Sequence, residues 1–469
     1  MTTPDPTPVP KGHAMSSSDV AVAVEPATHA AGRTSIVKVA FASMIGTAVE
    51  WYDFFLYGSA AALVFGPLFF PDSEPATATL LAFATFAVGF FARPLGGIVF
   101  GHYGDKLGRK KMLVVSLLMM GAATFAIGLL PTFASIGIAA PMLLIACRLL
   151  QGFAVGGEWG GAVLMAAEHG DNDRRGFWTS WTQAGVPLGN LLSAVVLWVL
   201  AWVQSDETFD SWGWRVPFLL SAVLVLIGLW IRLSIEESPV FAENKRALEN
   251  HKSEHAPIIE VLRKYPREVL IAMGLRLVEN TSYYIFTVVV MTYMVTYLDM
   301  PKSAAIAGVL IASVAQFFLT PLIGALSDRV GRRPLYFTGA LGAGIWGFVF
   351  FPLIDTGNQT IIAAAIFIGL IFTTLMYAPQ AAMFSELFGT SVRYSGASLG
   401  YQLASVFAGG LAPVIAVSLL GTVEEKNTIA VSIYLAILAV ITIIAVIAAK
   451  ETARTSLVHD RVLDEATRN

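Results

Sequence analysis

Two carboxylates lie inside an apolar stretch near the start of the chain, where an ionised side chain is costly. Glu50 and Asp53 belong to a run from about residue 37 to 65 that is long enough to cross a bilayer. Their i, i+3 spacing places both on one face of a helix, near its middle. A buried carboxylate can take up a proton or balance a buried cation, so the pair indicates proton transfer or anion binding within a membrane.

Arginines in two further apolar stretches could meet these acids. Arg93 and Arg148 both lie well inside their stretches. The guanidinium stays charged and presents a planar fork that matches a carboxylate. For Arg93 the sequence leaves two interpretations open, a structural ion pair with Asp53 or Glu50 and a contact for a substrate anion.

A third charged pair lies in the second half of the chain. Arg276 and Glu279 are again spaced i, i+3, and Tyr283 follows one turn later on the same helix face. An ion pair within the helix would explain both charges without a ligand, and a substrate pathway is the alternative.

The elements that position these residues are apolar segments long enough to be transmembrane helices, six before and six after a polar stretch from about residue 234 to 267. They span approximately residues 36–65, 77–100, 111–130, 138–163, 178–203, 213–233, 269–298, 304–326, 334–353, 360–387, 393–420 and 428–449.

Composition supports an integral membrane protein. Of 469 residues, 56% are hydrophobic and 13% are charged, and the mean hydropathy is +0.68. The sequence lacks the phosphate-binding loop of an ATP-driven pump and the H-E-x-x-H motif of a zinc hydrolase. A few charges of mixed sign, without a ring of identical groups, disfavour a channel. We therefore expect no catalytic residues, no metal, no cofactor and no nucleic-acid partner.

A loop motif occurs twice, at the same place in each half. Gly101–Lys110 follows the second segment and Gly324–Arg333 follows the eighth, with the shared pattern G-x-x-x-D-[KR]-x-G-R-[KR]. Lysines and arginines gather in these loops and in the others on their side, which predicts that both termini are cytoplasmic. Paired repeats of this kind are a transporter architecture with the binding site between the halves.

The duplicated loop and the six-plus-six organisation resemble the major facilitator superfamily over essentially the whole chain. Within it, six short motifs resemble the metabolite:proton symporter branch, which includes porters for shikimate, 2-oxoglutarate, citrate and proline or betaine. They are Glu50–Phe54, Arg93–Gly97, Gln151–Gly161, Ser211–Phe218, Glu237–Phe241 and Val392–Ser398.

The resemblance implies roles for the residues singled out above. It implies that the duplicated loops, through Asp105, Arg109, Asp328 and Arg332, hold helix ends together in one access state and release them in the other. We expect proton coupling at Asp53 first and at Glu50 second. Glu158 is a further candidate for coupling, with an ion pair to a loop cation as the alternative. The expected substrate-binding residues are Arg93, Arg276, Arg148, Tyr57, Gln151, Glu279 and Tyr283.

The expected fold is therefore an all-α membrane protein of 12 transmembrane helices in two pseudo-symmetric bundles. The expected divisions are a disordered cytoplasmic tail (1–33), a first bundle (34–233), a central cytoplasmic loop (234–268), a second bundle (269–450) and a C-terminal tail (451–469).

The expected activity is import of a small organic acid or related polar metabolite with a proton, by a monomer in a bacterial inner membrane. A symporter for a zwitterionic osmolyte such as proline or betaine, an uncoupled facilitator and a non-transporting receptor or scaffold remain the alternatives. The last of these leaves the duplication and the buried charges unexplained.

Overall fold

The computed structural model describes residues 36–107, 109–156, 159–169, 171–234, 257–388 and 393–453. These residues belong to one compact unit and are almost entirely helical, without a strand among them. The predicted N-terminal tail, Glu158 and most of the central loop lie outside the described residues, as do the side chains of Asp105 and Arg109.

The first part of the chain forms a series of long helices joined by short ones. In order they are α1 (Ile36–Ala60), η1 (Ala61–Phe65), α2 (Gly66–Phe69), α3 (Pro75–Leu107), α4 (Arg109–Leu129), α5 (Phe133–Ile136), α6 (Ala139–Val155), α7 (Trp159–His169), η2 (Asn172–Arg174), α8 (Arg175–Val203), α9 (Asp206–Thr208), η3 (Phe209–Gly213) and α10 (Arg215–Ser234).

The second part follows a similar plan. It comprises α12 (Pro257–Lys264), α13 (Pro266–Tyr284), η4 (Ile285–Val289), α14 (Val290–Thr292), η5 (Tyr293–Tyr297), α15 (Lys302–Val330), α16 (Arg332–Ile354), α17 (Gln359–Leu387), α18 (Arg393–Ser405), η6 (Val406–Gly410), α19 (Leu411–Leu420) and α20 (Thr428–Ala448).

The lengths of these helices suit a bilayer. In the described part, 9 helices are long and apolar enough to cross it, and the bent pair Asp206–Gly213 and Arg215–Ile231 makes 10. The apolar part of α4 and the run from α13 to η5 occupy the other two predicted spans. The prediction of an all-α membrane protein is confirmed, and the predicted helix count agrees with these segments.

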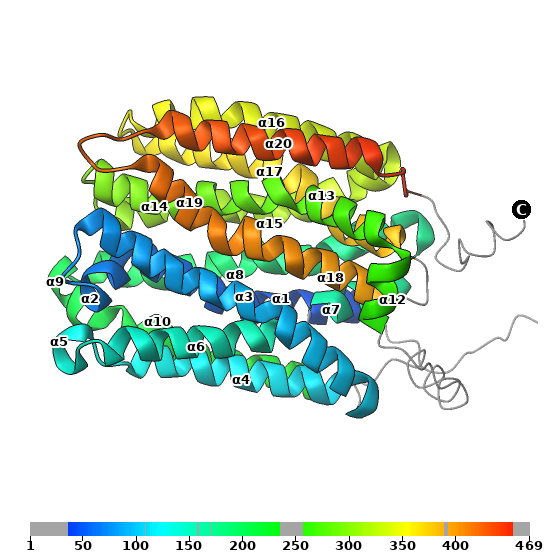
Figure 1. Ribbon diagram of the computed structural model, residues 1–469, viewed down its shortest axis with the longest axis horizontal. Helices are drawn as coiled ribbons and strands as arrows, with labels where there is room; N and C mark the ends of the chain where they lie inside the picture. The colour runs from blue at the N-terminus through cyan, green and yellow to red at the C-terminus, as the bar shows by residue number, and fades with distance from the viewer. Residues whose placement is uncertain are drawn as a thin grey trace, which may run out of the picture. The chain divides into compact units, whose positions relative to one another are not determined.

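The long helices run side by side with their connections at two ends (Figure 1). The turns between α3 and α4 and between α15 and α16 carry the duplicated motif, and we call their end of the bundle the loop-motif end. The short helices α2, α5 and α9 lie at the other end, which we call the opposite end.

Glycines allow α3 and α6 to touch backbone to backbone. A Cβ on Gly152 would lie 1.8 Å from the carbonyl oxygen of Gly89, and one on Gly156 would lie 2.0 Å from that of Arg93. Such separations admit no side chain. Gly152 and Gly156 therefore form a close helix contact, which brings Arg93 and Arg148 into neighbouring turns.

Candidate functional site

The acid Asp53 lies at one end of a chain of polar side chains that leads to Arg148. The Thr124 hydroxyl donates to Asp53 Oδ2 at 2.7 Å. Gln151 Nε2 donates to Thr124 Oγ1 at 2.6 Å, and Arg148 Nη1 donates to Gln151 Oε1 at 2.8 Å. All four side chains are buried, so this relay links an acid on α1 to a cation on α6 through α4 without water.

Arg93 lies in a box of aromatic rings. Its Cζ is 4.0 Å from the centroid of Phe54, 4.2 Å from that of Phe90 and 5.3 Å from that of Trp51. The side chain is 1% exposed, and its Nε and Nη2 atoms have no hydrogen-bond partner. Pro94, the next residue, cannot donate a backbone hydrogen bond within α3. The rings stabilise the cation by cation–π attraction and leave donors of the fork available.

The charged pair of the second half is held by amide and hydroxyl groups. Arg276 Nη1 lies 3.1 Å from Glu279 Oε2, and Gln380 on α17 contacts both, at 2.9 and 3.0 Å. Arg276 Nε donates to Ser405 Oγ at 3.0 Å. The ion pair within α13, one of the two interpretations of these charges, is present. It is buried, and the hydrogen bonds to Gln380 of α17 and Ser405 of α18 offset part of the cost of burying it.

A small cavity of about 10 Å³ lies where these groups meet. It is lined by Trp51, Val186, Arg276, Glu279, Asn280, Tyr283 and Tyr377, and therefore by both halves of the chain. The Asn280 Nδ2 and Tyr377 hydroxyl groups lack hydrogen-bond partners. A cavity of this size accommodates about one water and no metabolite, so a larger ligand requires the halves to separate here.

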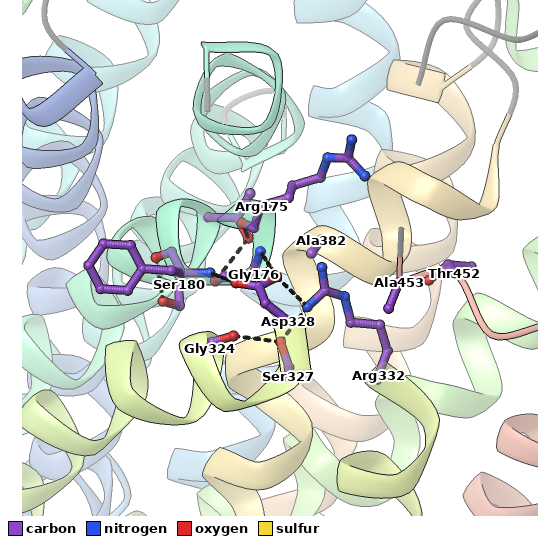
Figure 2. Close-up of polar contacts among 12 residues, drawn as sticks. Arg175, Gly176, Ser180, Gly324, Ser327, Asp328, Arg332, Ala382, Thr452 and Ala453 are labelled. Atoms are coloured by element: carbon purple, nitrogen blue, oxygen red, sulfur yellow. Dashed lines mark hydrogen bonds and ion pairs between the residues drawn. The ribbon is translucent and has the colours of Figure 1, made fainter. Parts of the chain in front are cut away.

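At the loop-motif end the halves are joined by charged contacts. Asp328 accepts hydrogen bonds from the backbone N–H groups of Gly176 and Phe177, at 2.8 and 2.9 Å, in the first turn of α8. Arg332 Nη1 lies 2.8 Å from Asp328 Oδ1, and Figure 2 shows Asp328 between Gly176 and Arg332. A carboxylate here also meets the positive end of the helix dipole.

The same cluster includes a second acid. Glu386 at the end of α17 pairs with Arg175 of α8 at 2.7 Å and with Arg332 at 3.3 Å. We call Arg175, Asp328, Arg332 and Glu386 the latch. The latch closes the loop-motif end, while at the opposite end Lys302 of α15 pairs with Asp210 of η3. Both ends are therefore bridged in this structure.

The structure brings together most of the residues predicted for the site. Asp53, Arg148 and Gln151 share the relay, and Arg276, Glu279 and Tyr283 line the cavity. Glu50 is buried and 3% exposed. Tyr57 bonds Thr85 at 2.6 Å and lies under Arg148, with 4.1 Å between its ring centroid and Cζ. Tyr57 thus belongs to the packing around Arg148 and does not line the cavity.

Several residues of the site carry no sequence signal strong enough to identify them. Thr124 occurs in an apolar helix, where a packing role is the simplest interpretation. The same is true of Asn190 of α8, whose amide donates to the hydroxyl of Tyr283 at 3.2 Å and to that of Ser313 at 3.1 Å, both in the other half. Arg175 lies in a basic loop, where arginine is expected for topology alone. Their partners lie far along the chain, so only the fold reveals them.

Known proteins resemble this chain along nearly all of its length. A family model described as "Sugar (and other) transporter" matches residues 38–460. The shikimate transporter of Escherichia coli (strain K12) is 43% identical over 399 residues, which is 85% of this chain and 91% of that protein. The inner membrane metabolite transport protein YhjE of the same organism is 42% identical over 425 residues, covering 90% and 95%.

More distant similarity extends to an osmolyte porter and to solved structures. The proline/betaine transporter of Escherichia coli (strain K12) is 34% identical over 426 residues, which is 90% of this chain and 84% of that protein. The proton:xylose symporter XylE bound to 6-bromo-6-deoxy-D-glucose superposes with a TM-score of 0.68 at 16% identity, covering 90% of this chain and 97% of that one. At that identity the structural match establishes the fold alone.

Proposed function

Since the chain belongs to the sugar (and other) transporter family of the major facilitator superfamily, we propose that it imports a small organic acid together with a proton by alternating access. Membership makes it a multi-pass membrane transporter and not an enzyme. The substrate, the coupling ion and the direction belong to the proposal. The single observation that carries it is the buried fork of Arg93, which retains unpartnered donors beside an acid-linked relay.

The chemistry of the site favours an anion over a quaternary ammonium compound. A trimethylammonium group binds best in an aromatic box that is free of other cations. Here the box of Trp51, Phe54 and Phe90 already surrounds the guanidinium of Arg93. The unpartnered groups around it and the cavity include Arg93 Nε and Nη2 and Asn280 Nδ2, which are all donors. A carboxylate with further oxygen atoms is the ligand that such donors fit.

Asp53 is the proposed proton carrier. It is 1% exposed, and its described partner is a neutral hydroxyl, so a proton can be added without breaking an ion pair to it. Thr124 lies 3.1 Å from the Met120 carbonyl as well as 2.7 Å from Asp53. When Asp53 is protonated, the hydroxyl can turn to that carbonyl and accept from the acid. The relay then transmits the change to Arg148.

The bridges at both ends support a cycle of alternating access. The latch and the Lys302–Asp210 pair describe an occluded arrangement, with the small cavity between them. Breaking one bridge while keeping the other opens the cavity to one side. Following the positive-inside rule, we assign the loop-motif end and both termini to the cytoplasm. We further propose that the protein lies in the inner membrane and works as a monomer, with six helices in each half.

Uptake into proteoliposomes tests the proposal. Labelled shikimate, proline and glycine betaine are offered separately, with an inward proton gradient and again with a protonophore. We expect shikimate to accumulate only with the gradient. A potassium-clamped potential should change accumulation little if one proton enters with one carboxylate, because the charges cancel. Accumulation of proline or betaine without shikimate would establish the osmolyte alternative, and downhill shikimate uptake indifferent to the protonophore would establish a facilitator.

A further inference from the structure

Three side chains form a stack across the interface between the halves. The ring centroids of Trp159 on α7 and Tyr401 on α18 lie 3.7 Å apart, with 16° between the ring planes. The Cζ atom of Arg276 lies 3.4 Å from the centroid of the same tyrosine. Two groups this close to one centroid cannot share a face, so Tyr401 is held between Trp159 and Arg276.

Hydrogen bonds hold the stack in register. The indole N–H of Trp159 lies 3.3 Å from Gln183 Oε1, and Gln183 Nε2 donates to the carbonyl of Tyr377 at 3.1 Å across the halves. Beside Tyr401, Gln402 Nε2 donates to the Gly156 carbonyl at 3.1 Å. Trp159 is 4% exposed and Tyr401 is 1% exposed, so the contact excludes water.

The stack lies between the cavity and the latch. Arg276 borders the cavity, while Trp159 follows Arg148 along the chain toward the loop-motif end. Phe384, whose ring packs edge-on to that of Trp159 with 6.0 Å between the centroids, lies two residues before Glu386 of the latch. A ligand leaving the cavity toward the loop-motif end must therefore separate Trp159 from Tyr401, which belong to different halves.

We propose that Trp159 and Tyr401 form the barrier that closes the central cavity toward the loop-motif end, and that Arg276 couples this barrier to occupancy of the cavity. This coupling rests on the proposed function in one respect, namely that the substrate has a carboxylate that contacts Arg276. A carboxylate in the cavity competes with the Tyr401 ring for the guanidinium. As the guanidinium turns to the carboxylate, Tyr401 loses the group that holds its second face, and the stack with Trp159 opens.

Side-specific cysteine labelling tests the barrier without any substrate. Cys147, the only native cysteine, is replaced by serine, and Val186→Cys places a thiol in the cavity wall. A charged, membrane-impermeant methanethiosulfonate is added to each side of the membrane in turn. We expect Trp159→Leu and Tyr401→Leu each to raise the labelling rate about 10-fold from the loop-motif side, because an aromatic stack is removed, and to leave the rate from the opposite side unchanged.

Conservative variants separate the barrier from general loosening. Trp159→Phe and Tyr401→Phe keep stacked rings and should stay within about 2-fold of the parent rate. Arg276→Lys keeps the charge opposite Glu279 but loses the flat guanidinium, and we expect about a 3-fold rise. Trp202→Leu is the matched control, since Trp202 stacks on Trp198 at 6.1 Å but is 69% exposed and outside the interface.

The outcomes distinguish this inference from the proposed function. Unchanged labelling in Trp159→Leu and Tyr401→Leu, at normal membrane abundance, overturns the barrier even if shikimate is transported. A rise equal from both sides overturns it too. If the leucine variants do not insert into the membrane, Arg276→Lys provides the test. A labelling rate equal to the parent's would rule out coupling of the barrier through Arg276. A side-specific rise supports the barrier even if shikimate is not the substrate.

Discussion

The hydroxyl of Thr124 donates to Oδ2 of Asp53 at 2.7 Å, although 71 residues separate them in the chain. This bond decides what the acid can do. A threonine hydroxyl has one proton and two lone pairs, so it can donate to an ionised carboxylate and accept from a protonated one. Because Gln151 also donates to it, Thr124 connects the protonation of Asp53 to the hydrogen bonds of Arg148.

Removing this hydroxyl should uncouple transport. We expect Thr124→Val to lower the accumulation ratio of shikimate about 10-fold or more, because a buried hydrogen bond to a charged group is worth about 1.5–3 kcal/mol. Thr124→Ser keeps the hydroxyl and should stay close to the parent.

Asp53→Asn should abolish uphill uptake while sparing exchange of preloaded substrate. Unchanged accumulation in Asp53→Asn would remove this acid from the mechanism.

The planar fork of Arg93 should decide affinity. Arg93→Lys keeps the charge but loses bidentate geometry and stacking on Phe54 and Phe90, so we expect KM for shikimate to rise about 10-fold or more with a smaller change in kcat. The measurement is initial uptake against concentration. Arg329→Lys, at an exposed position of the duplicated loop, is the control and should match the parent. Parental KM in Arg93→Lys would reject the contact.

Breaking the bridge at either end should open the cavity toward that side of the membrane. Asp328→Asn weakens the bonds to the first turn of α8, and Asp210→Asn removes the partner of Lys302. We expect the first to raise labelling of Val186→Cys from the loop-motif side and the second from the opposite side, each several-fold. The same direction for both variants would contradict the assignment of these contacts as alternate closures.

A carboxylate near the end of the chain should make stability depend on pH. Burial alone raises the pKa of Glu451, but backbone N–H groups of Ala453, Arg332, Arg333 and Thr452 donate to it and bring its pKa below the ordinary value. A lowered folded-state pKa means that the contribution to stability is fully present above the unfolded value and is lost as pH falls through the folded one.

Glu451→Gln measures that contribution. We expect a lower Tm than the parent at pH 7, because an anion at the start of α16 contributes about 0.3–1 kcal/mol to the free energy of unfolding. The difference should be smaller at about pH 3, because the carboxylate loses its stabilising contribution as pH falls below the ordinary glutamate pKa of about 4.3 and through the lower folded-state pKa. Thermal unfolding in detergent at the two pH values gives the comparison. A difference that is the same at both values would show that the charge is not responsible.

The close contact of α3 and α6 should not tolerate a methyl group. Gly152→Ala places Cβ 1.8 Å from the Gly89 carbonyl oxygen, so the helices must move apart. Overpacking of this kind costs about 1–3 kcal/mol, and we expect a lower Tm together with weaker uptake, since Arg93 and Arg148 shift with their helices. Gly58→Ala, whose Cβ meets Val288 at an ordinary 3.5 Å, is the matched control.

The sequence by itself determined the features that repeat along one helix. Segment length and hydropathy predicted the spans, and the duplicated motif predicted a transporter. The i, i+3 spacing placed Arg276 and Glu279 on one helix face, within reach of the ion pair that they form. The same spacing holds for Arg148 and Gln151, whose side chains are joined by a hydrogen bond. These predictions hold because the rise and period of a helix are constant, so short separations in sequence convert directly into separations in space.

Only the tertiary structure decided which helices face one another and at what register. Asp53 meets Thr124 across 71 residues, Arg175 meets Glu386 across 211, and Trp159 meets Tyr401 in the other half. For Arg93 the sequence left an ion pair and a ligand contact open, and the fold surrounds its guanidinium with Trp51, Phe54 and Phe90. Helix register depends on how every side chain at an interface packs, and no local pattern contains that information.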